Sequence, residues 1–294
     1  MYTYRTYELN IHSEIPLRAL ALADGEPDVL LVLAKPKSLD LLKSDGAHHF
    51  VGEVKGVATF AVFEGRKIVV DPQPGVDDGL LNTFIIGPIL AVLLRQRGLL
   101  VLHASSAVVN DVAIAFVGNS GAGKSTMAQA FHGHGYPVMT DDVMVVQLNG
   151  DCPMVLPGYP LIKLWPESVA ATGYAPDSMP FIHGSSTKRS HQLTSGFGQT
   201  AFPLGRIYIL DEGAEHRIVE LNASDACIAL LQHSRATTLL THPEFRAKNF
   251  RDCTWMAQNV PIARFERKPA LSELSDLVKL VEADLRGITT PVGI

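Results

Sequence analysis

One stretch decides the fold of this chain: Gly118-Asn119-Ser120-Gly121-Ala122-Gly123-Lys124-Ser125-Thr126. It matches G-x-x-x-x-G-K-[ST], the phosphate-binding P-loop, at every fixed position. The apolar run Val112–Val117 before it predicts a buried strand, and residues 127–131 after it predict a helix that a glycine at 133 or 135 can end. Strand, glycine-rich loop and helix are the context that the motif requires. The sequence therefore predicts an α/β domain built around this loop.

The residue types of this loop suit the phosphates of a nucleoside triphosphate. Glycines allow backbone N–H groups to turn toward phosphate oxygens, and the N-terminus of the following helix adds positive potential. Lys124 is expected to reach the β- and γ-phosphates, and the Ser125 hydroxyl is expected to ligate Mg²⁺. Residues 118–126 are therefore predicted to bind the nucleotide.

Composition and net charge describe a globular chain that does not bind nucleic acid. Of the 294 residues, 47% are hydrophobic and 19% are charged, which is not the composition of a disordered chain. The formal net charge of −5 supplies no basic surface for nucleic acid. The three cysteines are widely spaced and lack C-x-x-C spacing, which is typical of small buried residues in a reducing compartment.

Neither the N-terminal segment nor the most apolar run predicts a membrane protein. The opening sequence, MYTYRTY, lacks the apolar core of a signal peptide. The most apolar run, residues 80–94, is too short to span a bilayer and contains Asn82, Gly87 and Pro88. We therefore expect a buried helix there, a cytoplasmic location and no membrane partner.

Residues 1 to about 75 carry strand patterns. Tyr2, Tyr4 and Thr6 alternate with charged or polar neighbours, and Val29–Leu33 is a short apolar run. Residues 59–63 and 67–70 are separated by Glu-Gly-Arg, which predicts a hairpin with a glycine in its turn. A β-rich N-terminal region is therefore expected.

A helix and a strand connect this region to the P-loop. An aspartate at 77 or 78 can cap a helix that runs to about residue 97, where a glycine ends it. Residues 99–109 then predict a strand that leads through an Asn-Asp turn into the strand before the loop. We therefore expect two domains, a β-rich region with its helix over 1–96 and the P-loop domain over 97–294.

An acidic pair, Asp141-Asp142, lies inside the apolar segment 136–148. Two like charges in such a segment are costly unless something positive lies beside them, and magnesium at Ser125 is the obvious counter-charge. On a regular strand the two side chains would point to opposite faces, so the chain must bend there for both to serve one site. Alternatively, the pair is a turn at a strand end whose aspartates are solvated.

A second acidic pair, Asp211-Glu212, directly follows residues 206–210, four of which are apolar. Apolar residues closing on an acidic pair are typical of the Walker B strand of P-loop ATPases, where the aspartate holds Mg²⁺ through water. The same residues can also be an ordinary strand exit into a hairpin whose return strand covers 214–220. The Walker B interpretation would make this chain an ATPase.

From residue 153 to about 205 the chain is rich in Pro, Gly, Ser and His, which predicts irregular, surface-lying structure. Lys188 and Arg189 lie in this stretch and can either fold over a phosphate, as the cations of lids do, or stay solvated. The remaining predicted elements are helices over 223–233 and 243–258, a strand over 262–265, and an amphipathic helix over 271–286 with Leu271, Leu274, Leu277 and Val278 on one face.

Three motifs occur in a fixed order in the middle of the chain. His103 lies 21 residues before Lys124, and the acidic pair lies 17 and 18 residues after it. His103-Ala-Ser-Ser, the glycine-rich loop and Met139-Thr-Asp-Asp142 are similar in order and spacing to the motifs of the HPr kinase/phosphorylase family. The segment RGLLVLHAS, residues 97–105, resembles more closely the HPr-kinase-related proteins encoded with lasso-peptide biosynthesis genes. The resemblance covers residues 97–148.

The resemblance implies an α/β P-loop kinase domain of the HPr kinase/phosphorylase C-terminal type, preceded by the β-rich region. It implies ATP and Mg²⁺ as cofactors, with Lys124 and the loop amides on the triphosphate, and with Ser125 and Asp142 on magnesium. Asp141 is then the base toward an acceptor serine hydroxyl, and His103 lies near that aspartate and orients it.

The implied substrate is a peptide, and specifically the C-terminal serine of a lasso precursor peptide. Lys188 and Arg189 are the candidates for contacts with the acceptor or the γ-phosphate. Thr126 stands where HPr kinases have Glu, so neither the reverse phosphorylase reaction nor HPr as substrate follows from the resemblance. HPr kinases assemble into hexamers, which makes a homo-oligomer an expectation. The alternatives are a P-loop ATPase that uses Asp211-Glu212 and a nucleotide-gated regulatory protein.

Overall fold

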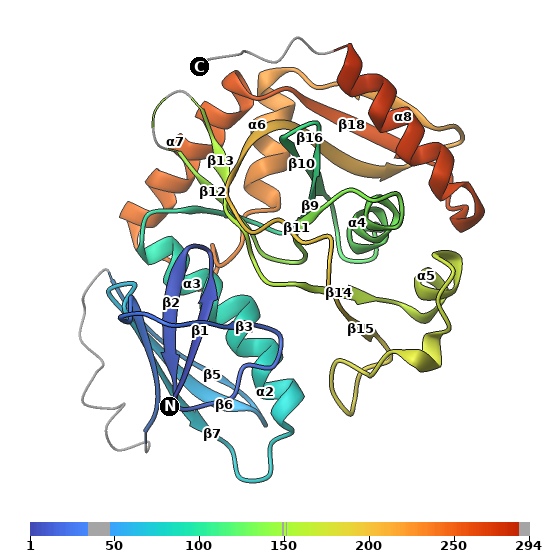
Figure 1. Cartoon of the computed structure of the whole chain (residues 1–294). Coiled ribbons are helices and arrows are strands. Elements are labelled where there is room, and N and C mark those ends of the chain that lie inside the picture. Colours follow the sequence, from blue (N-terminus) through green and yellow to red (C-terminus); the bar gives the residue numbers. More distant parts are fainter. Residues whose placement is uncertain (35–47, 149, 151, 288–294) are drawn as a thin grey trace.

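The computed structural model describes residues 1–34, 48–148, 150 and 152–287 (Figure 1). Over these residues the strands form a seven-stranded sheet, a nine-stranded sheet and a two-stranded ribbon. The seven-stranded sheet is N-terminal, and the nine-stranded sheet with its helices follows it in the chain (Figure 1). The chain thus has the α/β architecture and the β-rich N-terminal region that the sequence predicts.

The N-terminal sheet has the strand order β3-β1-β2-β4-β7-β6-β5. The predicted hairpin is confirmed as the antiparallel pair β6 and β7, which turns through Glu64 and Gly65. Both turn residues have left-handed φ angles, 51° and 64°, as a tight hairpin turn requires. The strands are β1 Tyr2–Thr6, β2 Leu9–Ser13, β3 Ala21–Leu22, β4 Val29–Leu33, β5 His49–Val54, β6 Ala58–Phe63 and β7 Lys67–Pro72.

A long helical segment packs against this sheet. It consists of α2 (Asp78–Phe84), a π-helical turn η1 (Ile85–Ile89) and α3 (Leu90–Gln96). Asp77 caps it by accepting a hydrogen bond from the Leu80 N–H at 2.8 Å. By length and composition alone the segment could cross a membrane, since its mean hydropathy reaches 1.5, but 67% of that window is buried inside the protein. It is the buried helix that the sequence predicts.

The second sheet carries the P-loop near its centre. Its strand order is β11-β9-β10-β16-β13-β12-β8, and β18 pairs with both β16 and β17. Strands β10, β16 and β18 run parallel, and β10 and β11 both run antiparallel to β9. The carboxyl ends of β11, β10, β16 and β18 therefore meet at one edge, where ligands bind in α/β sheets.

The strands of this part are β8 Leu100–Leu102, β9 Ala104–Val109, β10 Val112–Val117, β11 Val138–Thr140, β12 Met144–Gln147, β13 Met154–Val155, β16 Phe202–Glu212, β17 Arg217–Glu220 and β18 Ile262–Arg267, with the ribbon β14 Leu161–Leu164 and β15 Arg189–Gln192. The helices are α4 Lys124–Gly133, α5 Pro166–Ala171, η2 Pro176–Ser178, α6 Ala223–Gln232, α7 Pro243–Asn259, η3 Leu271–Glu273 and α8 Leu274–Arg286.

Helices cover both faces of the second sheet (Figure 1). Along β10, Ala113 and Ala115 belong to the apolar cluster that includes residues of α6 and α7. Ile114 and Phe116 belong to the cluster that includes residues of α4 and α8. Because side chains alternate along a strand, an unbroken apolar run such as β10 is buried on both of its faces.

Two elements differ from the prediction. The strand expected over 99–109 is broken at His103 into β8 and β9, and the His103 N–H donates to the His233 carbonyl at 2.8 Å. The helix expected from residue 271 begins at Leu274, and η3 precedes it, which leaves Leu271 38% exposed. In both places the apolar pattern continues across the break, so the periodicity of the sequence does not reveal it.

The tip of the first hairpin joins the two sheets. Tyr7 and Glu8, which link β1 and β2, have left-handed φ angles of 50° and 61°. The buried Tyr7 hydroxyl donates to the Val143 carbonyl at 2.7 Å, and its N–H donates to the Pro157 carbonyl at 2.8 Å. The N-terminal sheet therefore supports the chain directly after the acidic pair.

Candidate active site

The P-loop begins where β10 ends, at the edge of the second sheet. Gly121 and Gly123 have φ angles of 88° and 85°, a region that side chains with a Cβ seldom adopt. Lys124 donates from Nζ to the carbonyls of Gly118 at 2.8 Å and Asn119 at 2.9 Å, which holds the loop closed on itself. Burial lowers the pKa of Lys124 to about 8, against the opposing effect of the Asp141 carboxylate. The loop has the shape and the charge that a phosphate chain needs.

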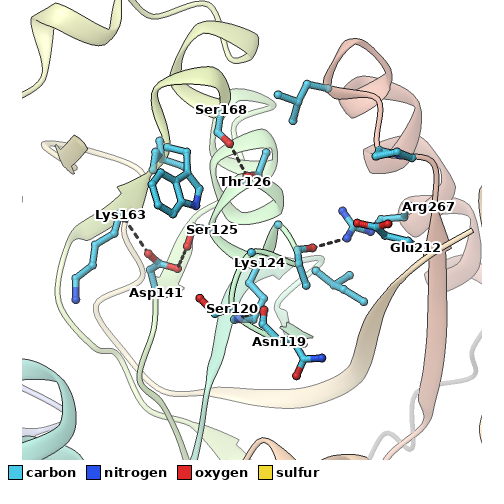
Figure 2. A pocket seen from close by; sticks show the side chains of 18 of the residues that line it. Asn119, Ser120, Lys124, Ser125, Thr126, Asp141, Lys163, Ser168, Glu212 and Arg267 are labelled. Carbon is cyan, nitrogen blue, oxygen red and sulfur yellow. Dashed lines mark hydrogen bonds between the residues drawn. The ribbon is translucent and has the colours of Figure 1, made fainter. Parts of the chain in front are cut away.

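Asp141 lies at the end of β11 and is only 1% exposed. Its Oδ1 accepts hydrogen bonds from the Ser125 hydroxyl at 2.8 Å and the Ser105 hydroxyl at 2.5 Å. Its Oδ2 accepts one from the Lys163 N–H at 2.9 Å, and Figure 2 shows the bonds from Ser125 and Lys163. Hydroxyl and backbone donors fix the orientation of this carboxylate. Asp141 is thus the acid in direct contact with the P-loop serine.

Asp142 turns away from its neighbour into a different environment. The predicted bend is confirmed, because β11 ends before the pair, β12 begins after it, and Asp142 has a left-handed φ of 77°. Its carboxylate contacts Lys163 Nζ at 3.1 Å and the Arg235 guanidinium, and its side chain is 22% exposed. The bend brings both carboxylates to one site but gives them different partners.

His103 contacts Asp142, the neighbour of the aspartate that the resemblance implies it orients. Its Nδ1 lies 3.1 Å from Asp142 Oδ1 and 2.8 Å from Arg235 Nη2. A guanidinium can only donate, so Nδ1 accepts from Arg235 and the ring proton is on Nε2. Burial, with the charges of Arg235 and Lys124, lowers the pKa of His103 to about 3. His103 is therefore neutral and is not an ion-pair partner of Asp142.

The same geometry favours a different assignment of the two aspartates. The resemblance implies that Asp142 and Ser125 hold magnesium, yet the described contacts of the Ser125 hydroxyl include Asp141 and not Asp142. A carboxylate beside the P-loop hydroxyl is the one suited to share a metal ion with it. Asp142, being more exposed and surrounded by cations, is the one suited to meet a substrate hydroxyl.

Two basic residues of this site escape the sequence analysis. Lys163 is buried, with 8% exposure, in the apolar strand β14, and a lysine inside an apolar run is a signal that could have indicated it. Arg235 follows α6 and donates its N–H to the Val101 carbonyl at 2.8 Å. No local pattern indicates Arg235, because only the folding of distant segments brings it to Asp142.

Of the two cations proposed as phosphate or acceptor contacts, only Lys188 lines the cavity. Its Nζ lies 4.9 Å from the Trp165 ring centroid, and burial lowers its pKa. Arg189 instead pairs with Asp177 at 3.1 Å and stacks on Phe181, with 3.9 Å from guanidinium to ring centroid. Its guanidinium is thus occupied outside the cavity, which corrects that expectation.

The Walker B candidate, Asp211, has no contact with the P-loop serine among the described hydrogen bonds. Its carboxylate accepts from the Glu212 N–H at 3.0 Å and lies 4.0 Å from Arg264 Nε, with 59% of the side chain exposed. Asp211 lines the rim of the cavity, on the opposite side of β10 from Asp141. The geometry favours Asp141 as the acid beside the P-loop.

The P-loop, the acidic pair and the cations around it line a cavity of about 1120 Å³, which is large enough for a nucleoside triphosphate and part of an acceptor. Within the described part of the chain, no group of three or more His, Cys, Asp or Glu side chains could hold a metal ion. A smaller set of oxygen donors is enough for Mg²⁺, which typically binds one or two protein oxygens and completes its shell with water and substrate phosphates. The Ser125 hydroxyl and the Asp141 carboxylate offer such a pair.

Neither a protein-family profile nor a curated protein matches this sequence. Among solved structures, the chain is similar to the Hpr(Ser) kinase/phosphatase from Coxiella burnetii, with 11% sequence identity and a TM-score of 0.35. The match covers 64% of this chain and 93% of that chain. At this identity and TM-score, the function of the chain has to be argued from its own site.

Proposed function

We propose that this protein is an ATP-dependent kinase that transfers the γ-phosphoryl group to an alcohol. The observation that carries the proposal is the separation of the two aspartates. One is hydrogen-bonded to the P-loop hydroxyl, and the other is turned by its left-handed backbone toward the cations Lys163 and Arg235. A kinase needs one acid for the metal and one for the acceptor hydroxyl.

In this proposal, Ser125 and Asp141 hold magnesium, and Lys124 with the loop amides holds the triphosphate. When bound, magnesium neutralises charge on the phosphate oxygens and orients them. The hydroxyl of Ser105 and the backbone N–H of Lys163 keep the Asp141 carboxylate oriented for this task. Thr126, the last residue of the motif, bonds Ser168 at 2.9 Å and so secures the start of α4.

Asp142 is the proposed base. Its carboxylate takes the proton of the substrate hydroxyl while the oxygen of that hydroxyl bonds to the γ-phosphorus. The bond between the γ-phosphorus and the β–γ bridging oxygen breaks, and ADP leaves. Lys163 and Arg235 hold the carboxylate in place, and neutral His103 keeps the guanidinium aimed at it. Because phosphoryl transfer passes through a loose transition state, orientation of the hydroxyl matters more than a strong base.

We further propose that the acceptor is a serine hydroxyl, at the C-terminus of a lasso precursor peptide. The resemblance over residues 97–105 supports this substrate. The cations Lys163, Lys188 and Arg235 also support it, because they line the acceptor side of the cavity and suit a carboxylate next to the hydroxyl.

The test is transfer of labelled phosphate from [γ-³²P]ATP to a peptide that ends in serine. Asp142→Asn tolerates the left-handed backbone, so it removes the base and keeps the fold. We expect transfer to fall by roughly 10²–10⁴-fold, with MgATP binding retained. Asp141→Asn is expected to abolish magnesium-dependent binding.

Asp177→Asn is the matched control, because Asp177 is 98% exposed and lies outside the cavity. Its transfer rate should equal that of the wild type. Undiminished transfer by Asp142→Asn would remove that residue from the mechanism. The ATPase alternative is separated by Asp211→Asn, which abolishes turnover only if Asp211 holds the metal. ATP binding with neither transfer nor hydrolysis would favour a nucleotide-gated regulatory protein.

A further inference from the structure

The cavity extends past the P-loop, away from the acidic pair, into an apolar end, beside which the charged residues Asp211, Glu212 and Lys268 also line the cavity. Leu210 of β16 and Leu274 and Leu277 of α8 line this end and are at most 7% exposed. Leu271 of η3 lines it too but is 38% exposed. An exposed apolar side chain that continues a buried apolar wall, beside a polar loop, indicates a surface that a ligand covers.

The positions of Ser125 and Asp141 determine which way a bound nucleotide runs. Asp141 follows β11, which lies on the β9 side of β10, whereas Leu210 lies near the end of β16 and Leu271 follows β18, on the other side of β10. A triphosphate in the loop has its γ end toward the acidic pair. Its nucleoside must then extend toward the ends of β16 and β18.

We propose that this apolar end is the subsite for the nucleotide base. The inference rests on the proposed nucleotide-binding function and adds the place and chemistry of base recognition. Leu271, with Pro269 and Ala270 of the same connection, offers aliphatic surface to a flat heteroaromatic ring. Such a wall favours nucleoside triphosphates over inorganic polyphosphates, because only the former carry a group that it can bury.

Arg267 connects the subsite to the P-loop. Its guanidinium donates to the Ala122 carbonyl (Figure 2). Its Nη1 lies 3.1 Å from where a Cβ on Gly123 would stand. Its buried Nε–H has no hydrogen-bond partner among the described residues. A buried donor without a partner is costly, and arginine donors suit phosphate oxygens. Arg267 therefore marks the path of the triphosphate between the acidic pair and the base.

The test compares calorimetric binding of MgATP and of magnesium tripolyphosphate to the full chain. We expect the wild type to bind ATP more tightly than tripolyphosphate. Leu271→Asn should weaken ATP binding about tenfold and leave tripolyphosphate binding unchanged. Ala270→Phe, which fills the same end instead of making it polar, should act in the same direction. Leu30→Asn is the control, since Leu30 is 39% exposed on β4, outside the cavity.

The outcomes separate this inference from the function on which it rests. Equal affinity of the wild type for both ligands would overturn the base subsite and leave the P-loop function standing. Equal weakening of both ligands by Leu271→Asn, with wild-type thermal stability, would overturn it as well. Failure of the wild type to bind either ligand would overturn the nucleotide-binding function and the subsite together.

Discussion

Asp142 holds a backbone conformation that few residues with a Cβ adopt. Its φ of 77° costs on the order of 1–2 kcal/mol relative to ordinary conformations, although Asp and Asn tolerate it better than other residues. The contacts with Lys163 and Arg235 help to hold it there. Strain of this kind is typical of sites where a side chain must be aimed. Here it brings to one site two adjacent carboxylates that a regular strand would place on opposite faces, and it gives them different partners.

His103 gives a prediction about stability and pH. Its pKa is about 3 in the folded protein and near 6.5 when unfolded. Between these values the unfolded chain binds the proton more tightly, so stability is full above pH 6.5 and falls as the pH drops toward 3. We expect His103→Gln to reduce this fall by up to about 1.4 kcal/mol per pH unit in that window. Urea unfolding at pH 7 and pH 4 measures it, and identical falls for wild type and variant would contradict it.

At the scale of elements, the β1–β2 hairpin stabilises the segment that carries the acidic pair. The Val143 carbonyl accepts from the Tyr7 hydroxyl at 2.7 Å and from the Thr140 hydroxyl at 2.7 Å. Thr6 also donates from its hydroxyl to the Gly158 carbonyl at 2.9 Å. These bonds fix both ends of the bend, so the N-terminal sheet contributes to the position of Asp142.

Tyr7→Phe tests this contribution. Loss of one buried hydrogen bond should lower the free energy of unfolding by about 1 kcal/mol, and phosphoryl transfer should fall more than MgATP affinity does. Tyr4→Phe is the matched control, because the buried Tyr4 hydroxyl accepts from the Leu17 N–H at 3.0 Å, a bond that stays within the N-terminal region. It should cost similar stability without the loss of kcat. Equal losses of kcat in both variants would show that Tyr7 contributes only to stability and does not position Asp142.

The sequence predicts elements well where the signal is local. The strand Val112–Val117, the P-loop, the helix after it and the β6–β7 hairpin all follow from motifs and periodicity within a few residues. The break at His103 does not, because a strand interrupted for one residue keeps its apolar pattern. The partners of Asp142 cannot be predicted either, since β14 and the segment after α6 reach it only through tertiary folding. The different partners of the two aspartates, on which the proposed roles rest, could not be predicted for the same reason.

At the scale of the whole molecule, one apolar core crosses the expected boundary at residue 97. That boundary falls between α3 and β8, but Val143, Val145 and Tyr159 belong to the same buried cluster as the N-terminal sheet. The two sheets are thus joined by shared apolar surface as well as by hydrogen bonds. Neither can be removed without exposing the core of the other.

A truncation tests this continuity. The fragment 97–294 should not fold on its own, because it would expose the apolar surface that now packs against the N-terminal sheet. We expect no cooperative thermal transition by circular dichroism and no MgATP binding by the fragment, with the full chain as control. A fragment that unfolds cooperatively and binds MgATP would show two independent domains.

The two-residue link between β1 and β2 has a consequence for how this chain can vary. Surface turns usually accept inserted residues, since their tips are solvated. Tyr7 of this turn is buried instead, and one additional residue would move its hydroxyl away from the Val143 carbonyl, which lies 136 positions further along the chain. Relatives of this protein that keep this site should therefore vary at position 8 more readily than in the length of the turn or in the Tyr7 hydroxyl.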